Sequence, residues 1–296
     1  MLRDRYETSG FGMCGTFSFM RMRSAPVVAA IFLLGSVKAY TQAIDLPTGK
    51  QIVQPVPGNP QRLNSLPMSM AVSPDSKYVV TVNAGYGTWE SGYAQSLAVT
   101  ETSTGKVTDF PDERMSLTAK QTMYSGLAFS GDGQSLYATV GSTTDPQGEN
   151  RKDLGNGIVV YNFRDGKITP DRIIKIPVQT LAPGRKTDLF KEDGGGKAIP
   201  FPAAIAVISE NTGAEHLVVA DNLSDDALLI DAKSGKILRR FDLSESNTVP
   251  STYPIAVAVS KDGARAFVAL WNASEVVELD LRHGTVGRKL DLLKPH

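Results

Sequence analysis

Short apolar runs separated by turn residues recur along most of this chain, and they predict β-strands. The first strand of each repeated segment is expected at Met68–Val72, Gly126–Phe129, Ala203–Val207 and Ile255–Val259. Turn sequences such as Ser130-Gly131-Asp132-Gly133 follow, and they are typical of a hairpin leading into a second strand. That second strand is apolar on both faces, as expected when other sheets pack against both of its sides.

The pattern repeats four times with fixed offsets of four residues. The first halves read Pro67-x3-Ala71-x3-Asp75, Tyr124-x3-Ala128-x3-Asp132, Pro202-x3-Ala206-x3-Glu210 and Pro254-x3-Ala258-x3-Asp262. The second halves read Glu101-x3-Gly105, Asn162-x3-Gly166, Asp231-x3-Gly235 and Asp280-x3-Gly284. Repeats of about 40–50 residues with strand patterning predict an all-β β-propeller with four-stranded antiparallel blades. The repeats are expected at about 66–115, 124–177, 201–244 and 253–292, within one propeller domain at 44–296.

The acidic residues that recur in these repeats are interpreted as structural. The glycine that follows each one can adopt positive φ without steric cost, and the acid four residues earlier can cap the backbone N–H groups of the turn. A residue that recurs in every repeat is expected to stabilise the structure that all repeats share, so no catalytic role is expected for any of these acids.

Four repeats leave the number of blades open. The segment Leu46–Ile52 resembles a further half-blade and is expected to close the propeller as the outer strand of the last blade. The chain is either a small four-bladed ring or part of a larger propeller. We favour the incomplete propeller, because an open end of a repeat array leaves apolar surface exposed.

The N-terminal residues 1–43 have the features of an export signal. Arg21 and Arg23 precede the apolar run Ala25–Val37, which is too short to span a bilayer as a mature helix. Small residues at Ala39 and Ala43 offer cleavage sites. Cleavage is favoured over an uncleaved membrane anchor, and a periplasmic or extracellular location is expected.

Residues 1–19 fit poorly as part of this signal, so translation is expected to start at Met20 or Met22. Cys14, the only cysteine, lies in that doubtful extension, and the mature protein would therefore contain no disulfide. Lysine plus arginine and aspartate plus glutamate balance at 31 each. This balance gives no indication of binding to nucleic acid or to an anionic membrane.

The blade sequence resembles the YVTN-type β-propeller repeat of secreted bacterial proteins. The matching stretches are Ser73–Asn83, Leu228–Lys236 and Ala266–Asn272, and the resemblance covers about residues 45–292. It implies the fold more strongly than a function. Some similar proteins carry a phosphoesterase domain after the propeller, and lactonase-type propellers share the repeat. No metal ligand or nucleophile of either kind can be matched to this chain.

Strand parity predicts where a binding site would lie. In four-stranded antiparallel blades, the loops between strands two and three and the links between blades emerge on the same face. The long segments Ala84–Gln95, Ser142–Gly155 and Val178–Ile199 all belong to that face, and long loops on a rigid scaffold often carry function. The ligand-face candidates are Asn83, Tyr86, Trp89, Tyr93, Trp271 and Asn272. The alternative is that the tryptophans only pack over the ends of the blades.

The signals for catalysis and metal binding are weak. His216, His283 and His296 lack the spacing of metal ligands, and no nucleophile elbow or phosphate loop is found. The segment Asp221–Asp226 could offer oxygen ligands to calcium, but a solvated turn is favoured there. No catalytic residue, metal or cofactor is therefore assigned.

The sequence predicts an exported β-propeller that serves as a binding or interaction scaffold. Its partner would be an unidentified protein or small-molecule ligand on the long-loop face, and neither nucleic acid nor a mature membrane span is expected. The alternative is an enzyme-related role, either as a lactonase-like hydrolase or as the accessory propeller of a phosphoesterase.

Overall fold

The computed structural model describes residues 44–45, 51–52, 63, 66–84, 94–115, 121–150, 153–191, 194–210 and 213–293. The chain divides into two compact units, residues 1–56 and 57–296. The predicted export signal lies outside the described residues. None of the described segments is a helix long and apolar enough to cross a bilayer.

In the first unit, β1 (Ile44–Asp45) pairs with β2 (Gln51–Ile52) as a two-stranded antiparallel sheet. We had expected this segment to supply the outer strand of the last blade. That expectation is wrong here, because β2 pairs with β1 and the last blade has its own fourth strand, β22 (Thr285–Asp291).

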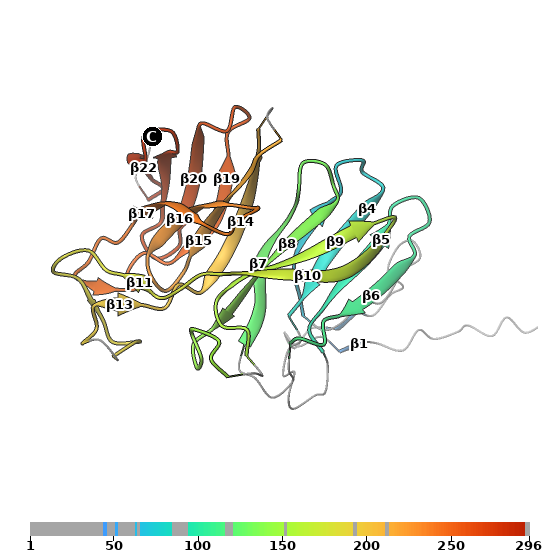
Figure 1. Cartoon of the computed structure of the whole chain (residues 1–296), viewed down its shortest axis with the longest axis horizontal. Coiled ribbons are helices and arrows are strands. Elements are labelled where there is room, and N and C mark those ends of the chain that lie inside the picture. The colour runs from blue at the N-terminus through green and yellow to red at the C-terminus, as the bar shows by residue number, and fades with distance from the viewer. Residues whose placement is uncertain are drawn as a thin grey trace, which may run out of the picture. The chain divides into compact units, whose positions relative to one another are not determined.

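The second unit contains four sheets of four antiparallel strands, each in sequence order (Figure 1). Blade 1 consists of β3 (Pro67–Val72), β4 (Tyr78–Asn83), β5 (Ser96–Glu101) and β6 (Val107–Pro111). Blade 2 consists of β7 (Gln121–Phe129), β8 (Ser135–Ser142), β9 (Gly157–Arg164) and β10 (Lys167–Lys175). Blade 3 consists of β14 (Pro202–Ser209), β15 (Glu215–Asp221), β16 (Asp226–Asp231) and β17 (Ile237–Asp242). Blade 4 consists of β19 (Pro254–Val259), β20 (Arg265–Leu270), β21 (Glu275–Asp280) and β22. The prediction of an all-β propeller with four-stranded antiparallel blades is confirmed.

Short strands join the links that precede blades 3 and 4. β11 (Gln179–Thr180) pairs with β13 (Lys197–Ala198), and β12 (Lys186–Thr187) pairs in parallel with β18 (Thr248–Val249). A small apolar cluster of Leu181, Ala198 and Val249 holds these links together. The two links therefore form one packed layer.

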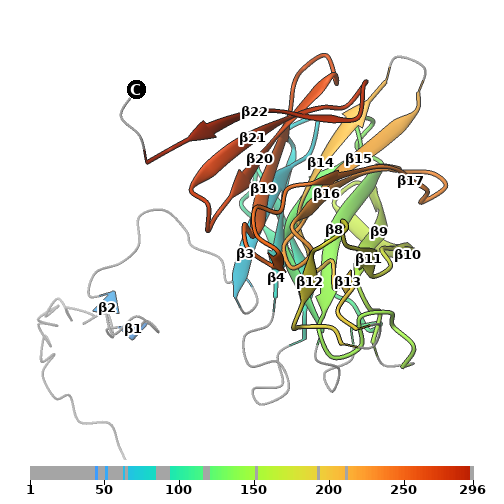
Figure 2. The ribbon, with the colours of Figure 1, turned by 90° about the vertical axis from the view of Figure 1, so that its left-hand side faces the viewer.

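The core lies between neighbouring blades rather than within any one of them. The central strands β8 and β15 contribute to it from both of their faces, as predicted, whereas β4 and β20 of the terminal blades contribute from one face only. Each of the first three blades packs on the next one, and no comparable packing joins blade 4 to blade 1 among the described residues. The four blades are therefore an open series from blade 1 to blade 4, which Figure 2 views from the side of β22.

The hairpins between first and second strands share one hydrogen-bonding device. A serine hydroxyl donates to the aspartate two residues later, in the pairs Ser73–Asp75 (2.7 Å), Ser130–Asp132 (2.7 Å) and Ser260–Asp262 (2.6 Å). This hydrogen bond is the main cause of a lowered pKa in each aspartate, and a hydrogen bond from a backbone N–H is the second cause. The recurring acids here stabilise turns, in agreement with the structural interpretation.

The hairpins between third and fourth strands use a related cap. The backbone N–H of Ser234 donates to the Asp231 carboxylate (2.6 Å), and that of His283 donates to Asp280 (2.9 Å). In blade 1, the carboxylate of Glu101 accepts from the Thr104 hydroxyl instead (2.6 Å). The predicted cap of backbone N–H groups is thus confirmed for Asp231 and Asp280, whereas Glu101 caps through a side chain.

Candidate functional site

The two ends of the blades differ in how the chain covers them. We call the end that carries the tight hairpins of each blade the turn end; in blade 3 it comprises residues 210, 213–215 and 232–236. We call the opposite end, with the loops between second and third strands and the links between blades, the loop end; in blade 3 it comprises residues 222–225 and 243–253. The described sequence candidates, Asn83, Trp271 and Asn272, belong to the loop end.

Three further candidates, Tyr86, Trp89 and Tyr93, lie outside the described residues. Asn83 is fully buried, and its amide donates to the Ser96 hydroxyl (3.1 Å). That hydroxyl in turn donates to the Asp109 carboxylate (2.6 Å). Asn83 therefore links three strands of blade 1 and has no surface to offer a ligand.

Trp271 and Asn272 lie together in the turn between β20 and β21. The side chain of Trp271 is 70% exposed, whereas the Asn272 amide donates to the Ser251 carbonyl (2.8 Å). Asn272 thus ties blade 4 to the preceding link. Of the described candidates, Trp271 presents the most accessible side chain, and the structure does not bring it together with Asn83 into one site.

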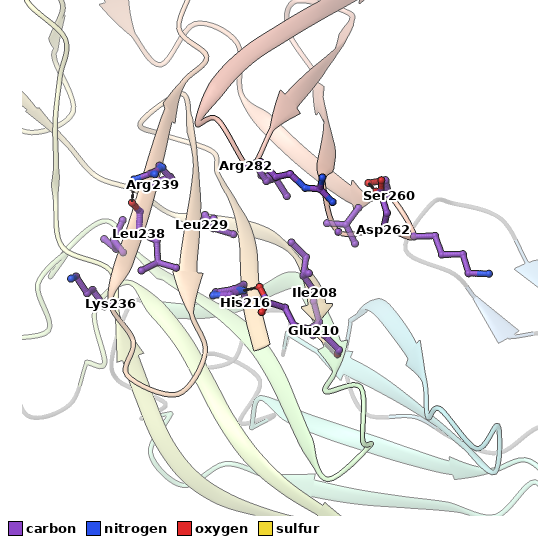
Figure 3. A pocket seen from close by; sticks show the side chains of 17 residues that line it. Ile208, Glu210, His216, Leu229, Lys236, Leu238, Arg239, Ser260, Asp262 and Arg282 are labelled. Carbon is purple, nitrogen blue, oxygen red and sulfur yellow. Dashed lines mark hydrogen bonds and ion pairs between the residues drawn. The ribbon is translucent and has the colours of Figure 1, made fainter. Parts of the chain in front are cut away.

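A cleft with a volume of about 1040 Å³ opens at the turn end between blades 3 and 4 (Figure 3). Its walls come from the β14–β15 hairpin and β17 on one side and from the β19–β20 and β21–β22 hairpins on the other. The volume is at the upper end of the range of ligand pockets. The sequence analysis did not predict this cleft, because it assigned function to the opposite end.

The cleft is wider than the groove between blades 1 and 2, which has a volume of only about 320 Å³. Tyr78 pairs with the last residue of the third strand in blade 1, and His216 takes that register position in blade 3. The Tyr78 ring packs edge-on against Phe163 of blade 2, with ring centroids 5.4 Å apart. The cleft between blades 3 and 4 is lined by the smaller imidazole of His216 instead.

The lining of the cleft combines an apolar floor with a cationic rim. The floor includes Ile208, Leu229 and Leu238. The rim carries four cations and two acids, namely Lys236, Arg239, Lys261, Arg282, Glu210 and Asp262. None of the four cations forms an ion pair with any residue that the structure describes. The rim therefore has an excess of positive charge, although the whole chain is balanced.

The two acids of the rim already have partners. Glu210 lies 3.3 Å from Nδ1 of His216, and Asp262 accepts the hydroxyl hydrogen of Ser260. Figure 3 shows Glu210 and His216 side by side, with Arg239 on β17 of the same blade and Arg282 on the wall that blade 4 forms. The cationic groups are therefore the ones left available to an incoming ligand.

A second group of unusual residues lies at the loop end of blade 3. Asp221 and Asp226 are direct register partners on β15 and β16, and both are fully buried. Asp226 accepts hydrogen bonds from Ser224 Oγ (2.7 Å) and from Nε of Arg240. Neither carboxylate oxygen of Asp221 has a conventional hydrogen-bond donor.

Burial changes the protonation of this acid pair. It raises the pKa of Asp226 to about 6, against the opposing charge of Arg240. It also raises the pKa of Asp221 well above its usual range, and the neighbouring charge of Asp226 adds to this effect. Burial therefore favours the protonated form of Asp221, next to an Asp226 carboxylate that Arg240 balances.

Asp225 fixes the link into blade 4. Its carboxylate accepts hydrogen bonds from the backbone N–H groups of Ser251, Thr252 and Tyr253, and from the Ser251 hydroxyl (2.6 Å). The favoured interpretation of this segment as a solvated turn is wrong, since all three aspartates are fully buried. The oxygens of Asp225 are fully occupied, and the described residues contain no group of acids, histidines or cysteines that could hold a metal.

Comparison with known proteins adds no functional assignment. No protein-family model matches the chain, and no curated protein matches it. Among solved structures it is similar to the hydrazine synthase of Kuenenia stuttgartiensis, at 16% identity and a TM-score of 0.47, over 80% of this chain and 52% of that one. It is also similar to the periplasmic gluconolactonase of Pseudomonas aeruginosa, at 15% identity and a TM-score of 0.48, over 77% of this chain and 58% of that one. The chain spans between half and three fifths of the length of these structures.

Proposed function

We propose that this protein is an exported binding scaffold and that its ligand occupies the cleft between blades 3 and 4. The observation that supports this most is the combination, in one cleft, of an apolar floor and four cations without ion-pair partners. The export signal expected at the N-terminus would place this binding activity outside the cytoplasm.

The lining indicates the class of ligand. Ile208, Leu229 and Leu238 would accept an apolar body, and Arg239 and Arg282 would receive a carboxylate or another anionic group. Arginine is suited to such groups because its planar guanidinium can donate two parallel hydrogen bonds. An amphipathic anion, such as an acidic peptide with apolar side chains, fits both parts of the cleft.

The proposal is tested by fluorescence anisotropy with a labelled peptide of alternating aspartate and leucine. We expect saturable binding that weakens as salt is raised, and no binding of the matching lysine-leucine peptide. The double variant Arg239→Ala and Arg282→Ala should weaken binding by roughly tenfold or more. The matched control is Lys77→Ala with Arg164→Ala, which removes two cations from the groove between blades 1 and 2 at the same end. Equal affinity for both variants would reject the cleft as the site.

One observation favours a hydrolytic alternative. The imidazole of His216 and the carboxylate of Glu210 face each other in the cleft at 3.3 Å, and a carboxylate that orients a histidine is a common arrangement for a general base. Hydrolysis of a lactone or a phosphate ester by the purified chain, lost in His216→Ala, would support it. Unchanged hydrolysis in that variant, or none in the wild type, would reject it.

A further inference from the structure

The two terminal blades present the unpaired halves of a blade-to-blade interface. We call the face of a blade that packs on the preceding blade its leading face and the opposite one its trailing face. Every exposed large hydrophobic side chain except Leu189 lies on blade 1, on blade 4 or directly beside them. The exposed apolar surface of the described residues is therefore concentrated at the two ends of the series.

Blade 1 has an apolar leading face with no blade on it. Met70 and Val72 of β3 are 70% and 54% exposed. Their register positions hold Leu127 and Phe129 in blade 2, Ile205 and Val207 in blade 3, and Val257 and Val259 in blade 4. In those three blades the side chains pack into the core shared with the preceding blade. Met70 and Val72 thus occupy interface positions that lack a partner.

Blade 4 presents the complementary trailing face. Phe267, Val276 and Leu290 take the register positions of Val218, Ala227 and Phe241, which pack from blade 3 onto blade 4. Leu290 is 48% exposed. Glu278 replaces Leu229 at this face and lies 3.5 Å from Arg265 and 3.2 Å from Arg288. Its charge is therefore balanced within blade 4.

We propose that a second copy of this chain covers both faces, so that two copies close into one two-fold symmetric ring. The leading face of blade 1 in each copy packs on the trailing face of blade 4 in the other. The same chain supplies both halves of the interface, in the register that already packs three times within it. Two-fold closure then uses both open faces equally, and closed two-fold assemblies are the most common oligomers.

The test is sedimentation velocity of the full chain over a range of concentrations. We expect a species of twice the monomer mass for the wild type. Met70→Glu with Val72→Glu on the leading face, and Leu290→Glu on the trailing face, should each weaken association by roughly tenfold or more. Leu189→Glu is the matched control, because Leu189 is equally exposed (52%) but lies outside the terminal blades, and it should leave the dimer intact.

Mixing the two kinds of variant distinguishes this ring from a dimer in which identical faces meet. In the proposed ring, a mixed pair retains one interface in which both faces are wild type, so mixing should restore part of the association. In a dimer of two leading faces, Leu290→Glu would leave association unchanged, and mixing the variants would not restore association. That result, or a monomer at every concentration, would overturn the proposal. The variants change exposed side chains, and unchanged circular dichroism would show that they fold.

Discussion

The two ends of blade 3 use charged residues in opposite ways. At the turn end, Lys236 and Arg239 are exposed and line an open cleft. At the loop end, Asp221, Asp225 and Asp226 are fully buried, and Asp225 accepts hydrogen bonds from the link into blade 4. One end leaves its charges available to solvent and ligands, whereas the other uses them to hold the chain together.

The difference shows that an unusual charge is not by itself a binding site. Asp221 has the most strongly perturbed surroundings among the described acids, but no surface through which a ligand could reach it. The cleft cations Lys236 and Arg239, by contrast, are exposed. For this protein, the accessibility of a side chain is the better guide to ligand binding, and the shifted pKa of a buried aspartate indicates a structural role.

The largest expected effect comes from breaking the buried pair of Asp226 and Arg240. Asp226→Ala leaves the Arg240 guanidinium next to an empty site and should lower the free energy of unfolding by about 3–5 kcal/mol. Urea denaturation measures this change. Loss of less than about 1 kcal/mol would mean that the pair does not hold the loop end together. Asp226→Asn is the matched control, since it keeps the shape and removes only the charge.

Asp221→Asn should stabilise the protein above neutral pH. The pKa of Asp221 is raised in the folded state, so its contribution is most favourable below the unfolded value of 3.8 and is lost as pH rises toward the folded pKa. The wild type should therefore lose stability as pH rises above about 4, and the variant should lose less of it. An asparagine amide can donate to Asp226 as the protonated acid does, and relieving a buried polar group is worth about 1–3 kcal/mol. Melting temperatures at several pH values test this, and parallel profiles for both proteins would contradict it.

A smaller effect is expected at the turn end. Asp132→Asn weakens the hydrogen bonds from Ser130 and from the N–H of Gln134 (2.9 Å). We expect a loss of about 0.5–1 kcal/mol in the free energy of unfolding. The pKa of Asp132 is lowered, so its contribution is present above the usual aspartate range and is lost as pH falls through the folded pKa. The stability difference from the wild type should therefore disappear in acid, opposite to the trend for Asp221.

The smallest change in stability is expected where the change in binding is greatest. Arg239→Ala with Arg282→Ala should alter the free energy of unfolding by less than about 0.5 kcal/mol per site, because both side chains are exposed. Thermal melts run next to the peptide titrations measure both quantities. A large loss of stability would show that the cleft cations are structural, as the buried aspartates are.

The sequence predicted the repeated parts of this molecule well, because each blade follows from local patterning. The Asp75, Asp132 and Asp262 turns could be predicted since their partners lie two residues away in the chain. The burial of Asp225 could not, because its donors are 26 to 28 residues further on and reach it only when the link folds back.

The cleft was also beyond local patterning. Its lining comes from hairpins of blades 3 and 4, which meet only when the two blades pack together. A signal was present in the sequence, since aligning the four repeats exposes both His216 at the register position of Tyr78 and the acid pair Asp221–Asp226. Departures from a repeat, rather than the repeated residues, mark the positions where blade 3 differs in chemistry.

Hydrogen–deuterium exchange with and without the aspartate-leucine peptide tests most directly which end of the blades binds a ligand. If the ligand occupies the cleft, we expect slower exchange in the cleft segments 207–210, 236–239 and 260–263, with no change in the turn at 271–274. Slower exchange confined to 271–274 and to the link at 251–253 would contradict it and would place the binding site at the loop end.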